Sequence, residues 1–164
     1  MINTTHITTG AAVGLAIGGL VSEPLVAVPL SIVAGIVSHH ILDLIPHTDA
    51  GSFRDKSKMS DPLSHNELLF ALFDNIIGTS VILALFFAKE PSWAMLFGAA
   101  GGNFPDVFHH PNQWSAITRD YFKGKYYHFH ETYHTTARGS LIPLGVATNA
   151  TLIIGSLCYI WTFH

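Results

Sequence analysis

Residues 38–49, S-H-H-I-L-D-L-I-P-H-T-D, place histidines and aspartates at the end of a long apolar run. His39 and Asp43 are four residues apart, so on a helix both side chains lie on one face, one turn apart. Pro46 disfavours helix at the preceding residue, which places His47 where the chain leaves the helix. Imidazole and carboxylate groups are common metal ligands, so the spacing favours a metal site. The alternative is a polar helix end with solvated histidines.

A second segment, G-N-F-P-D-V-F-H-H-P at residues 102–111, repeats this combination. Asp106 precedes His109 by three residues and His110 by four, and either histidine can share its helical face. Two Asp/His pairs on neighbouring helices can hold two metal ions with a carboxylate bridge. Two ions roughly 3.5–4 Å apart suit phosphoester or amide hydrolysis, because they stabilise both the attacking and the leaving oxygen.

A third segment, H-E-T-Y-H at residues 130–134, matches the zinc-protease pattern H-E-x-x-H. On a helix, His130 and His134 would bind one zinc ion, and Glu131 would act as general base toward a bound water. No acidic residue follows Glu131, so a third ligand has to come from an upstream carboxylate. The alternative is an amphipathic segment whose tyrosines and histidines lie at the level of lipid headgroups.

Three aspartates, Asp43, Asp74 and Asp106, lie within or at the edge of apolar stretches. An ionised carboxylate in such a place costs about 2.5–3.5 kcal/mol on insertion scales, so each one needs a partner. A divalent metal ion with histidine co-ligands is one such partner, and a hydrogen bond or an Asp–His pair is another. Asp74 and Glu131 are the candidate general bases, since neither has an evident structural partner in the sequence.

The composition is that of a membrane protein. Of the 164 residues, 49% are hydrophobic and 12% are charged, against roughly 25% charged residues in soluble proteins. The net charge of −3 gives no basic surface, which argues against a nucleic-acid partner. A single cysteine excludes an intrachain disulfide framework and a cysteine-ligated zinc cluster.

Five apolar stretches must position the polar segments. Together they predict an all-α, polytopic membrane bundle of about five transmembrane helices, formed by one domain over residues 1–164, with an amphipathic segment at 109–138. Glycines that recur in two of these stretches, at 10, 14 and 18 and at 98, 101 and 102, predict close helix packing. The five stretches cover about 7–22, 24–45, 66–88, 92–108 and 140–163.

Five spans would place the N-terminus, residues 45–65 and residues 109–140 on one side of the bilayer. Seven of the eight basic residues fall there, Lys89 being the exception, which predicts a cytoplasmic N-terminus. Ten of the eleven histidines lie toward the same side. We therefore predict a metal site near the cytoplasmic face, with ligands drawn from His6, His39, Asp43, His65, Asp106, His110, His130 and His134.

Four short segments occur in order along the chain: T-H-I-T-T-G at 5–10, L-D-L-I-P-H-T-D at 42–49, S-H-N-E-L-L at 64–69 and G-N-F-P-D at 102–106. Together they resemble the membrane-bound metal-dependent hydrolases, a family of small inner-membrane proteins with LexA-regulated members. The resemblance covers about residues 5–110 and implies a prokaryotic inner-membrane location and metal binding by His6, Asp43, His65 and Asp106. It supplies no defined substrate.

These patterns predict a membrane-embedded metal-dependent hydrolase that acts on a phosphoester, with a phospholipid as one candidate substrate. The expected cofactor is one or two divalent ions, zinc first, with manganese and iron as alternatives. Two other functions stay open at the level of sequence. One is an intramembrane zinc metalloprotease that uses residues 130–134, and the other is a metal-binding or scaffold membrane protein without catalytic activity.

Overall fold

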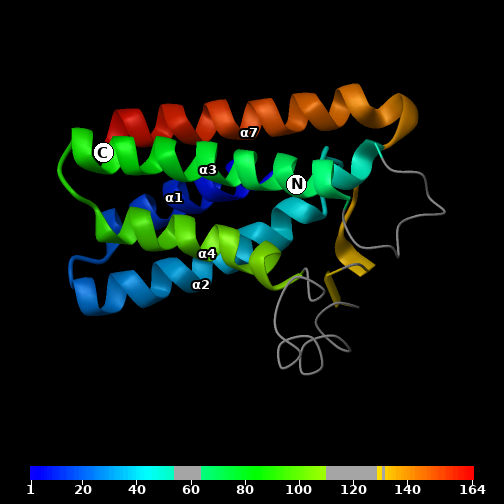
Figure 1. Cartoon of the computed structure of the whole chain (residues 1–164). Helices are drawn as coiled ribbons and strands as arrows, with labels where there is room; N and C mark the ends of the chain where they lie inside the picture. The colour runs from blue at the N-terminus through cyan, green and yellow to red at the C-terminus, as the bar shows by residue number, and fades with distance from the viewer. Residues whose placement is uncertain (54–63, 110–128, 131) are drawn as a thin grey trace.

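A computed structural model of the chain describes residues 1–53, 64–109, 129–130 and 132–164. The described part is helical, which confirms the predicted all-α class. Its long helices lie side by side along a common direction (Figure 1). They are α1 (Asn3–Leu20), α2 (Pro24–Asp43), α3 (His65–Ala88), α4 (Trp93–His109) and α7 (Ile142–Phe163), with short 3₁₀ helices η1 (Ala50–Phe53) and η4 (Gly139–Leu141).

Local signals in the sequence set the helix ends. Helix α2 begins at Pro24, where a missing backbone N–H costs no intrahelical hydrogen bond, and it ends three residues before Pro46. Helix α3 begins with a capping box, in which the Ser64 hydroxyl accepts from the Glu67 amide and the Glu67 carboxylate accepts from the Ser64 amide. The predicted apolar stretches therefore coincide closely with the observed helices.

Helix α1 lies at the centre of the bundle and packs against α4, α2, α7 and α3. Glycines on α1 and α4 face each other, as their recurrence predicted. A Cβ atom at Gly10 would collide with the carbonyl oxygen of Gly98, and one at Gly102 would collide with the carbonyl oxygen of His6. Helix α4 approaches α2 in the same way, because a Cβ atom at Gly101 would collide with the carbonyl oxygen of Ile32. These contacts bring three helix backbones close together.

Three helices in the described part are long and apolar enough to cross a membrane, where the sequence predicted five. They are Pro24–Asp43, His65–Ala88 and Gly139–Phe163, the last combining η4 and α7. Helices α1 and α4 have 18 and 17 residues, against about 20 for a full span. Both are rich in small residues, and α1 buries Thr4, Thr5 and Thr8 against its neighbours, so neither needs a uniformly apolar surface.

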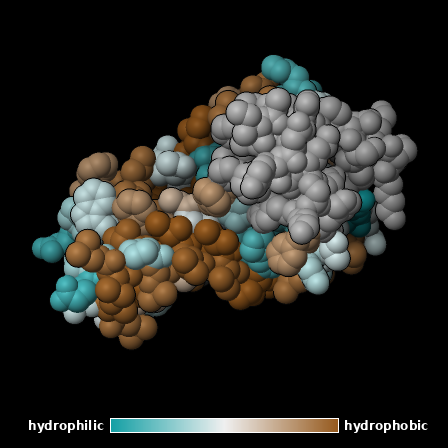
Figure 2. Space-filling model, turned by 90° about the horizontal axis from the view of Figure 1, so that it is seen from below, coloured by the Kyte–Doolittle hydropathy of each residue, from teal (hydrophilic) through white to brown (hydrophobic). Residues whose placement is uncertain are grey.

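Large apolar side chains point outward over much of the molecule. In Figure 2, hydrophobic side chains predominate along the bundle, and hydrophilic ones gather toward its ends. A soluble monomer rarely exposes so continuous an apolar surface, so the arrangement is compatible with a membrane protein. The exposed apolar residues of the three spanning-length helices include Leu25, Val33 and Val37 on α2, Phe70, Phe73 and Ile77 on α3, and Leu144 and Ile154 on α7.

Candidate metal centre

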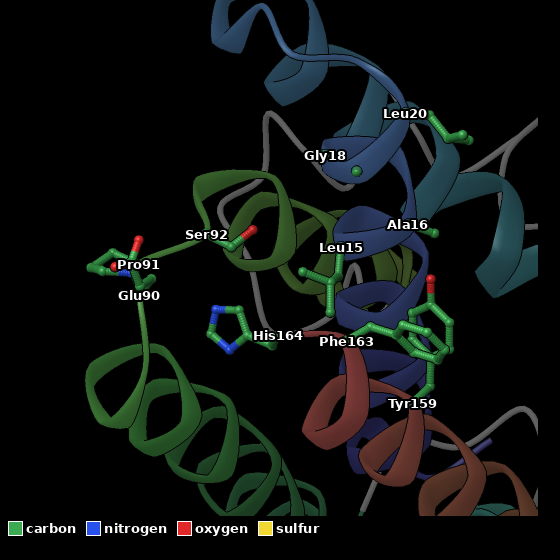
Figure 3. A pocket seen from close by; sticks show the side chains of 11 residues that line it. Leu15, Ala16, Gly18, Leu20, Glu90, Pro91, Ser92, Tyr159, Phe163 and His164 are labelled. Atoms are coloured by element: carbon green, nitrogen blue, oxygen red, sulfur yellow. The ribbon is translucent and has the colours of Figure 1, made fainter.

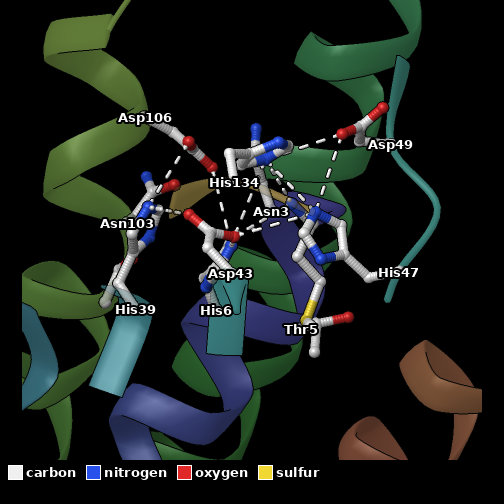
Figure 4. A network of polar contacts seen from close by, with 12 residues as sticks. Asn3, Thr5, His6, His39, Asp43, His47, Asp49, Asn103, Asp106 and His134 are labelled. Carbon is white, nitrogen blue, oxygen red and sulfur yellow. Dashed lines mark hydrogen bonds and ion pairs between the residues drawn. The ribbon is translucent and has the colours of Figure 1, made fainter. Parts of the chain in front are cut away.

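Histidine and aspartate side chains converge at one end of the bundle, around the carboxylate of Asp43 (Figure 4). The first turn of α1, the last turns of α2 and α4, and the segment before η4 all meet there. Asp43 is 2% exposed, and the closest histidines are buried as well. The surrounding side chains are those of His6, His39, His47, Asp49, Asp106, His130 and His134.

Three donor atoms form a tight triangle on one side of this carboxylate. Asp43 Oδ2 lies 3.0 Å from His39 Nε2 and 3.1 Å from His130 Nε2, and the two nitrogens are 3.3 Å apart. Two ligands of one tetrahedral zinc ion, each about 2.0–2.1 Å from the metal, are themselves about 3.3 Å apart. Asp106 Oδ1 lies 3.6 Å from His39 Nε2 and 3.9 Å from His130 Nε2, close enough to serve as a fourth donor.

The tautomer of His39 follows from its second nitrogen. His39 Nδ1 lies 2.8 Å from the carbonyl oxygen of Gly102, which can only accept a hydrogen bond. In the neutral ring, Nδ1 therefore carries the proton and Nε2 presents a lone pair toward Asp43. Asp43 Oδ2 accepts no hydrogen bond of good geometry within the described residues, despite its two close nitrogens. A lone pair aimed at a carboxylate oxygen fits a cation between them, with Gly102 as the outer partner that orients the ligand.

His6 adds a further donor, which is grouped with His39 and Asp106 but lies nearest the other carboxylate oxygen of Asp43. The residue is fully buried, and neither ring nitrogen makes a hydrogen bond within the described part of the chain. Its Nε2 atom lies 3.2 Å from Asp43 Oδ1 and 4.0 Å from Asp106 Oδ2, and its ring stacks on that of His39 with centroids 3.8 Å apart. Burying polar atoms without hydrogen bonds costs free energy, which ligation of a metal ion would offset at one nitrogen.

A second group of donors lies on the other side of Asp43. His47 Nε2 and His134 Nε2 are 3.2 Å apart, and each lies 3.6 Å from Asp49 Oδ2. Asp43 Oδ1 is 3.8 Å from His47 Nε2 and 3.7 Å from His134 Nε2. The α-amino nitrogen of Met1 also approaches this group, at 3.3 Å from both Asp43 Oδ1 and His134 Nε2.

Backbone and side-chain hydrogen bonds hold this second group in place. The His47 amide donates to the Thr135 carbonyl at 3.3 Å, and the Ala137 amide donates to the His47 carbonyl at 2.7 Å. The Asn149 side chain on α7 donates to the Thr48 carbonyl at 2.8 Å. The segment after α2 is therefore fixed against the segment before η4, although about ninety residues of sequence separate them.

Electrostatics keep two of these groups in the protonation states that metal ligands require. Burial, reinforced by the Met1 α-amino group, lowers the pKa of His134 to about 3. Burial raises the pKa of Asp49, but the neighbouring His47 imidazole, the positive charge of the Met1 α-amino group and the hydrogen bond from the Thr136 hydroxyl outweigh that effect, so this pKa lies below its usual value. At neutral pH the imidazole is therefore neutral and the carboxylate ionised, the forms that bind metal.

The structure brings six of the eight predicted ligands together. Two other residues with predicted roles, one a ligand and one a general base, are not among these clustered donors. His65 is the first residue of α3, is exposed, and belongs to none of the groups of clustered donors. Asp74, a predicted general base, accepts hydrogen bonds from the amide and hydroxyl of Thr4 at 3.2 and 2.6 Å, so it caps the first turn of α1. Neither residue enters the centre proposed below.

Two predicted residues lie outside the described part of the chain. They are His110, a predicted ligand, and Glu131, the other candidate general base. The side chain of His109, the alternative to His110, is also outside it. Their roles stay predictions from the sequence.

The predicted ligand set omitted His47 and Asp49, which the structure places beside Asp43. A signal for them was present in H-T-D at residues 47–49. Side chains two residues apart in an extended segment point to the same side, and His47 forms an isolated β-bridge with Thr136. The residues before Pro46 were predicted to be helical, and helical spacing does not place His47 and Asp49 on the same side.

A separate hollow lies at the opposite end of the bundle (Figure 3). Leu15, Leu20, Ser92 and Phe163 are among the residues that line it. It opens between the last turns of α1 and α7 and the beginning of α4. The metal-ligand cluster is therefore not part of this hollow.

No protein-family model, no curated protein and no solved structure matches this chain. The resemblance to membrane-bound metal-dependent hydrolases therefore stays an expectation from short motifs.

Proposed function

We propose that the chain is a membrane-embedded metal-dependent hydrolase that acts on a phosphoester, with phospholipids among its candidate substrates. The observation that carries the proposal is the triangle of His39 Nε2, His130 Nε2 and Asp43 Oδ2, with edges of 3.0 to 3.3 Å. The hydrogen bond from His39 Nδ1 to Gly102 supports it, because it leaves the inward nitrogen free to bind a cation.

The donors fit a divalent ion, and zinc is the first candidate. Imidazole and carboxylate together also suit iron and manganese, so the donor set alone does not select among them. When bound, such an ion lowers the pKa of a water molecule and polarises a phosphoryl oxygen. The surrounding residues of the chain determine on which side the site is closed and on which side it is accessible. His6 and His39 close it toward the bundle interior, whereas Asp106 and His134 retain 17% and 16% side-chain exposure on its outer side.

The outward apolar surface supports placement in a lipid bilayer. Helices α2, α3 and α7 would present their apolar faces to lipid, and the shorter α1 and α4 would complete a five-helix bundle. The excess of basic residues in the segments on the metal-centre side supports a cytoplasmic N-terminus. The resemblance to the inner-membrane hydrolases supports a prokaryotic inner membrane. The centre would then lie near the cytoplasmic headgroups, where a lipid phosphoester can reach it.

The positions of His130 and His134 favour this proposal over the zinc-protease alternative. In an H-E-x-x-H protease both histidines bind one zinc ion. Here His130 Nε2 lies 3.1 Å from Asp43 Oδ2, whereas His134 Nε2 lies nearer Oδ1, at 3.7 Å. The two imidazoles thus lie nearest to different oxygens of the Asp43 carboxylate.

The first experiment is metal analysis of the detergent-purified protein, with His39→Ala beside His65→Ala. We expect near-stoichiometric zinc, manganese or iron in wild type and in His65→Ala, and loss of at least one ion in His39→Ala. His65→Ala is the matched control because it removes an imidazole that is exposed and belongs to none of the donor groups. A metal-free wild type would instead assign the cluster to a protonated His/Asp network and overturn the proposal.

Hydrolysis is then measured on phospholipid vesicles, a soluble phosphodiester and a peptide. Cleavage of either phosphoester, reduced at least 100-fold in His39→Ala, is the expected result. Peptide cleavage alone would support the protease alternative. Bound metal without hydrolysis of any of the three would support a metal-binding scaffold.

A further inference from the structure

We infer that the centre holds a second divalent cation, bound by His47, His134, Asp49 and the Oδ1 atom of Asp43. The Asp43 carboxylate then bridges two ions, one at each oxygen. This inference rests on the proposed metal centre and adds to it a site that uses two residues outside the predicted ligand set. Its support comes from hydrogen bonds that surround the second group of donors.

The tautomer of His47 follows from its outer nitrogen. His47 Nδ1 lies 2.7 Å from the carbonyl oxygen of Ile45 and must donate to it. In the neutral ring the proton is therefore on Nδ1, and Nε2 points a lone pair into the group. The ring is fully buried, so water does not satisfy this lone pair from bulk solvent.

The tautomer of His134 follows from a relay through Thr136. The Thr136 hydroxyl donates its one proton to Asp49 Oδ2, at 2.8 Å. It must therefore accept from His134 Nδ1, which lies 3.1 Å away. His134 Nε2 is then also a bare lone pair, 3.2 Å from the lone pair of His47 Nε2. Two facing lone pairs cannot hydrogen-bond to each other, and a shared cation removes their repulsion.

The oxygens complete a four-donor set. Asp49 Oδ2 is 3.6 Å from both nitrogens, and Asp43 Oδ1 is 3.7 and 3.8 Å from them. Donors around one zinc ion are about 3.3 Å apart, so closure around an ion needs shifts of a few tenths of an ångström. Two nitrogen and two oxygen donors also surround the other side of Asp43, where His39, His130 and Asp106 lie around Oδ2. His6 Nε2, 3.2 Å from Oδ1, is an additional donor between the two sets.

The α-amino group of Met1 is the rival for this position. Its nitrogen is 3.3 Å from both Asp43 Oδ1 and His134 Nε2. In its protonated form it would supply a positive charge to the carboxylate and a proton to the imidazole lone pair. The amine and the second ion therefore make opposite predictions for the number of metal ions per chain.

A second ion narrows the substrate class. One divalent ion leaves the three carboxylates of Asp43, Asp49 and Asp106 with a net negative charge, whereas two ions reverse the sign. A positive centre attracts an anionic phosphoester, and paired ions stabilise the attacking and leaving oxygens of an in-line displacement at phosphorus. The positive charge of the paired site thus favours an anionic phosphoester over an uncharged peptide bond.

The test is the metal content and the low-temperature electron paramagnetic resonance spectrum of protein loaded with Mn²⁺. We expect two ions per wild-type chain, with an exchange-coupled spectrum. His47→Ala should retain one ion and give the six-line spectrum of isolated Mn²⁺. His65→Ala, an equal truncation at an exposed position, should behave as wild type.

Asp49→Asn, which keeps the shape of the side chain, provides a second route if His47→Ala does not fold. It too should retain one ion and lose the coupling. One ion in wild type, unchanged in both variants, would overturn the second site in favour of the Met1 amine and leave the proposed hydrolase intact. A wild type without bound metal would overturn both.

Discussion

At the scale of single residues, Asp43 and Asp74 show how packing separates chemically identical side chains. Both are aspartates of long apolar helices, and both were expected to need a partner. Asp74 receives two hydrogen bonds from Thr4, whose amide is among the unsatisfied donors at the start of α1. Asp43 is instead surrounded by five imidazole nitrogens. Two lie near Oδ2, from His39 and His130, and three lie near Oδ1, from His6, His47 and His134.

Substitution of the two aspartates should therefore have different consequences. Asp43→Asn removes the charge and the bridging oxygen, so we expect it to lose all bound metal and at least 1,000-fold in hydrolysis. Asp74→Asn keeps an acceptor for the Thr4 hydroxyl and should keep its metal, with a modest loss of thermal stability. Metal analysis, activity and thermal unfolding in detergent check this pair. Full activity of Asp43→Asn, or loss of metal only in Asp74→Asn, would contradict the assignment.

At the scale of elements, the glycine contact between α1 and α4 positions the inner half of the metal centre. Gly102 lies against the backbone of His6, and its own carbonyl accepts from His39 on α2. One residue thus ties three helices together at the level of the centre. Without a side chain at Gly102, the helices approach closely enough for His6 and His39 to stack.

Gly98→Ala tests the importance of this approach without touching a ligand. The added methyl group would meet the Gly10 carbonyl and lie 2.7 Å from the Gly14 Cα atom. Backbone atoms cannot rotate away, so we expect a loss of about 1–3 kcal/mol from overpacking and weaker metal affinity. Gly155→Ala on α7 is the matched control, because nothing lies within 4 Å of the added atom. It should be neutral or stabilise by about 0.4–1 kcal/mol.

Thermal unfolding and metal titration of both glycine variants provide the measurement. Equal midpoints for Gly98→Ala and Gly155→Ala would mean that α1 and α4 can separate at no cost. That result would contradict the close packing described above.

At the scale of the whole molecule, chemistry and apolar surface are separated along the bundle axis. The proposed metal centre lies at the end formed by the starts of α1, α3 and α7 and by the ends of α2 and α4 (Figure 1). The sides of the bundle carry exposed apolar residues of α2, α3 and α7. In a bilayer this geometry places all ligands at one interface and leaves the opposite interface to the connections α1–α2 and α3–α4.

Cysteine accessibility in right-side-out membrane vesicles tests this placement. In a Cys158→Ser background, Glu90→Cys marks the α3–α4 connection and Asn66→Cys marks the first turn of α3. Both positions are exposed. A membrane-impermeant maleimide should label the first from outside and the second only after permeabilisation. The reverse pattern would place the metal centre outside the cytoplasm, and labelling of both without permeabilisation would contradict a spanning α3.

The sequence by itself determined the helices and the end of the bundle where the chemistry lies. Helix ends depend on local signals, such as Pro24 at the start of α2 and the Ser64–Glu67 capping box of α3. Hydropathy depends only on composition within a window, so all five helices were predicted, although α1 and α4 are not among the three that are long and apolar enough to span a membrane. Because histidines and aspartates occur near helix ends on one side, six predicted ligands meet in space.

The tertiary structure alone decided which of these atoms face one another. Spacing along a helix states that two side chains share a face, but the rotation of each helix about its axis decides what that face meets. This rotation directs Asp74 to Thr4 and leaves His65 exposed. His47 and Asp49 join the centre through pairing with residues 135–137, a contact between distant segments that no local pattern encodes. Local interactions thus determine where the helices form, and long-range packing determines which side chains face one another in the candidate site.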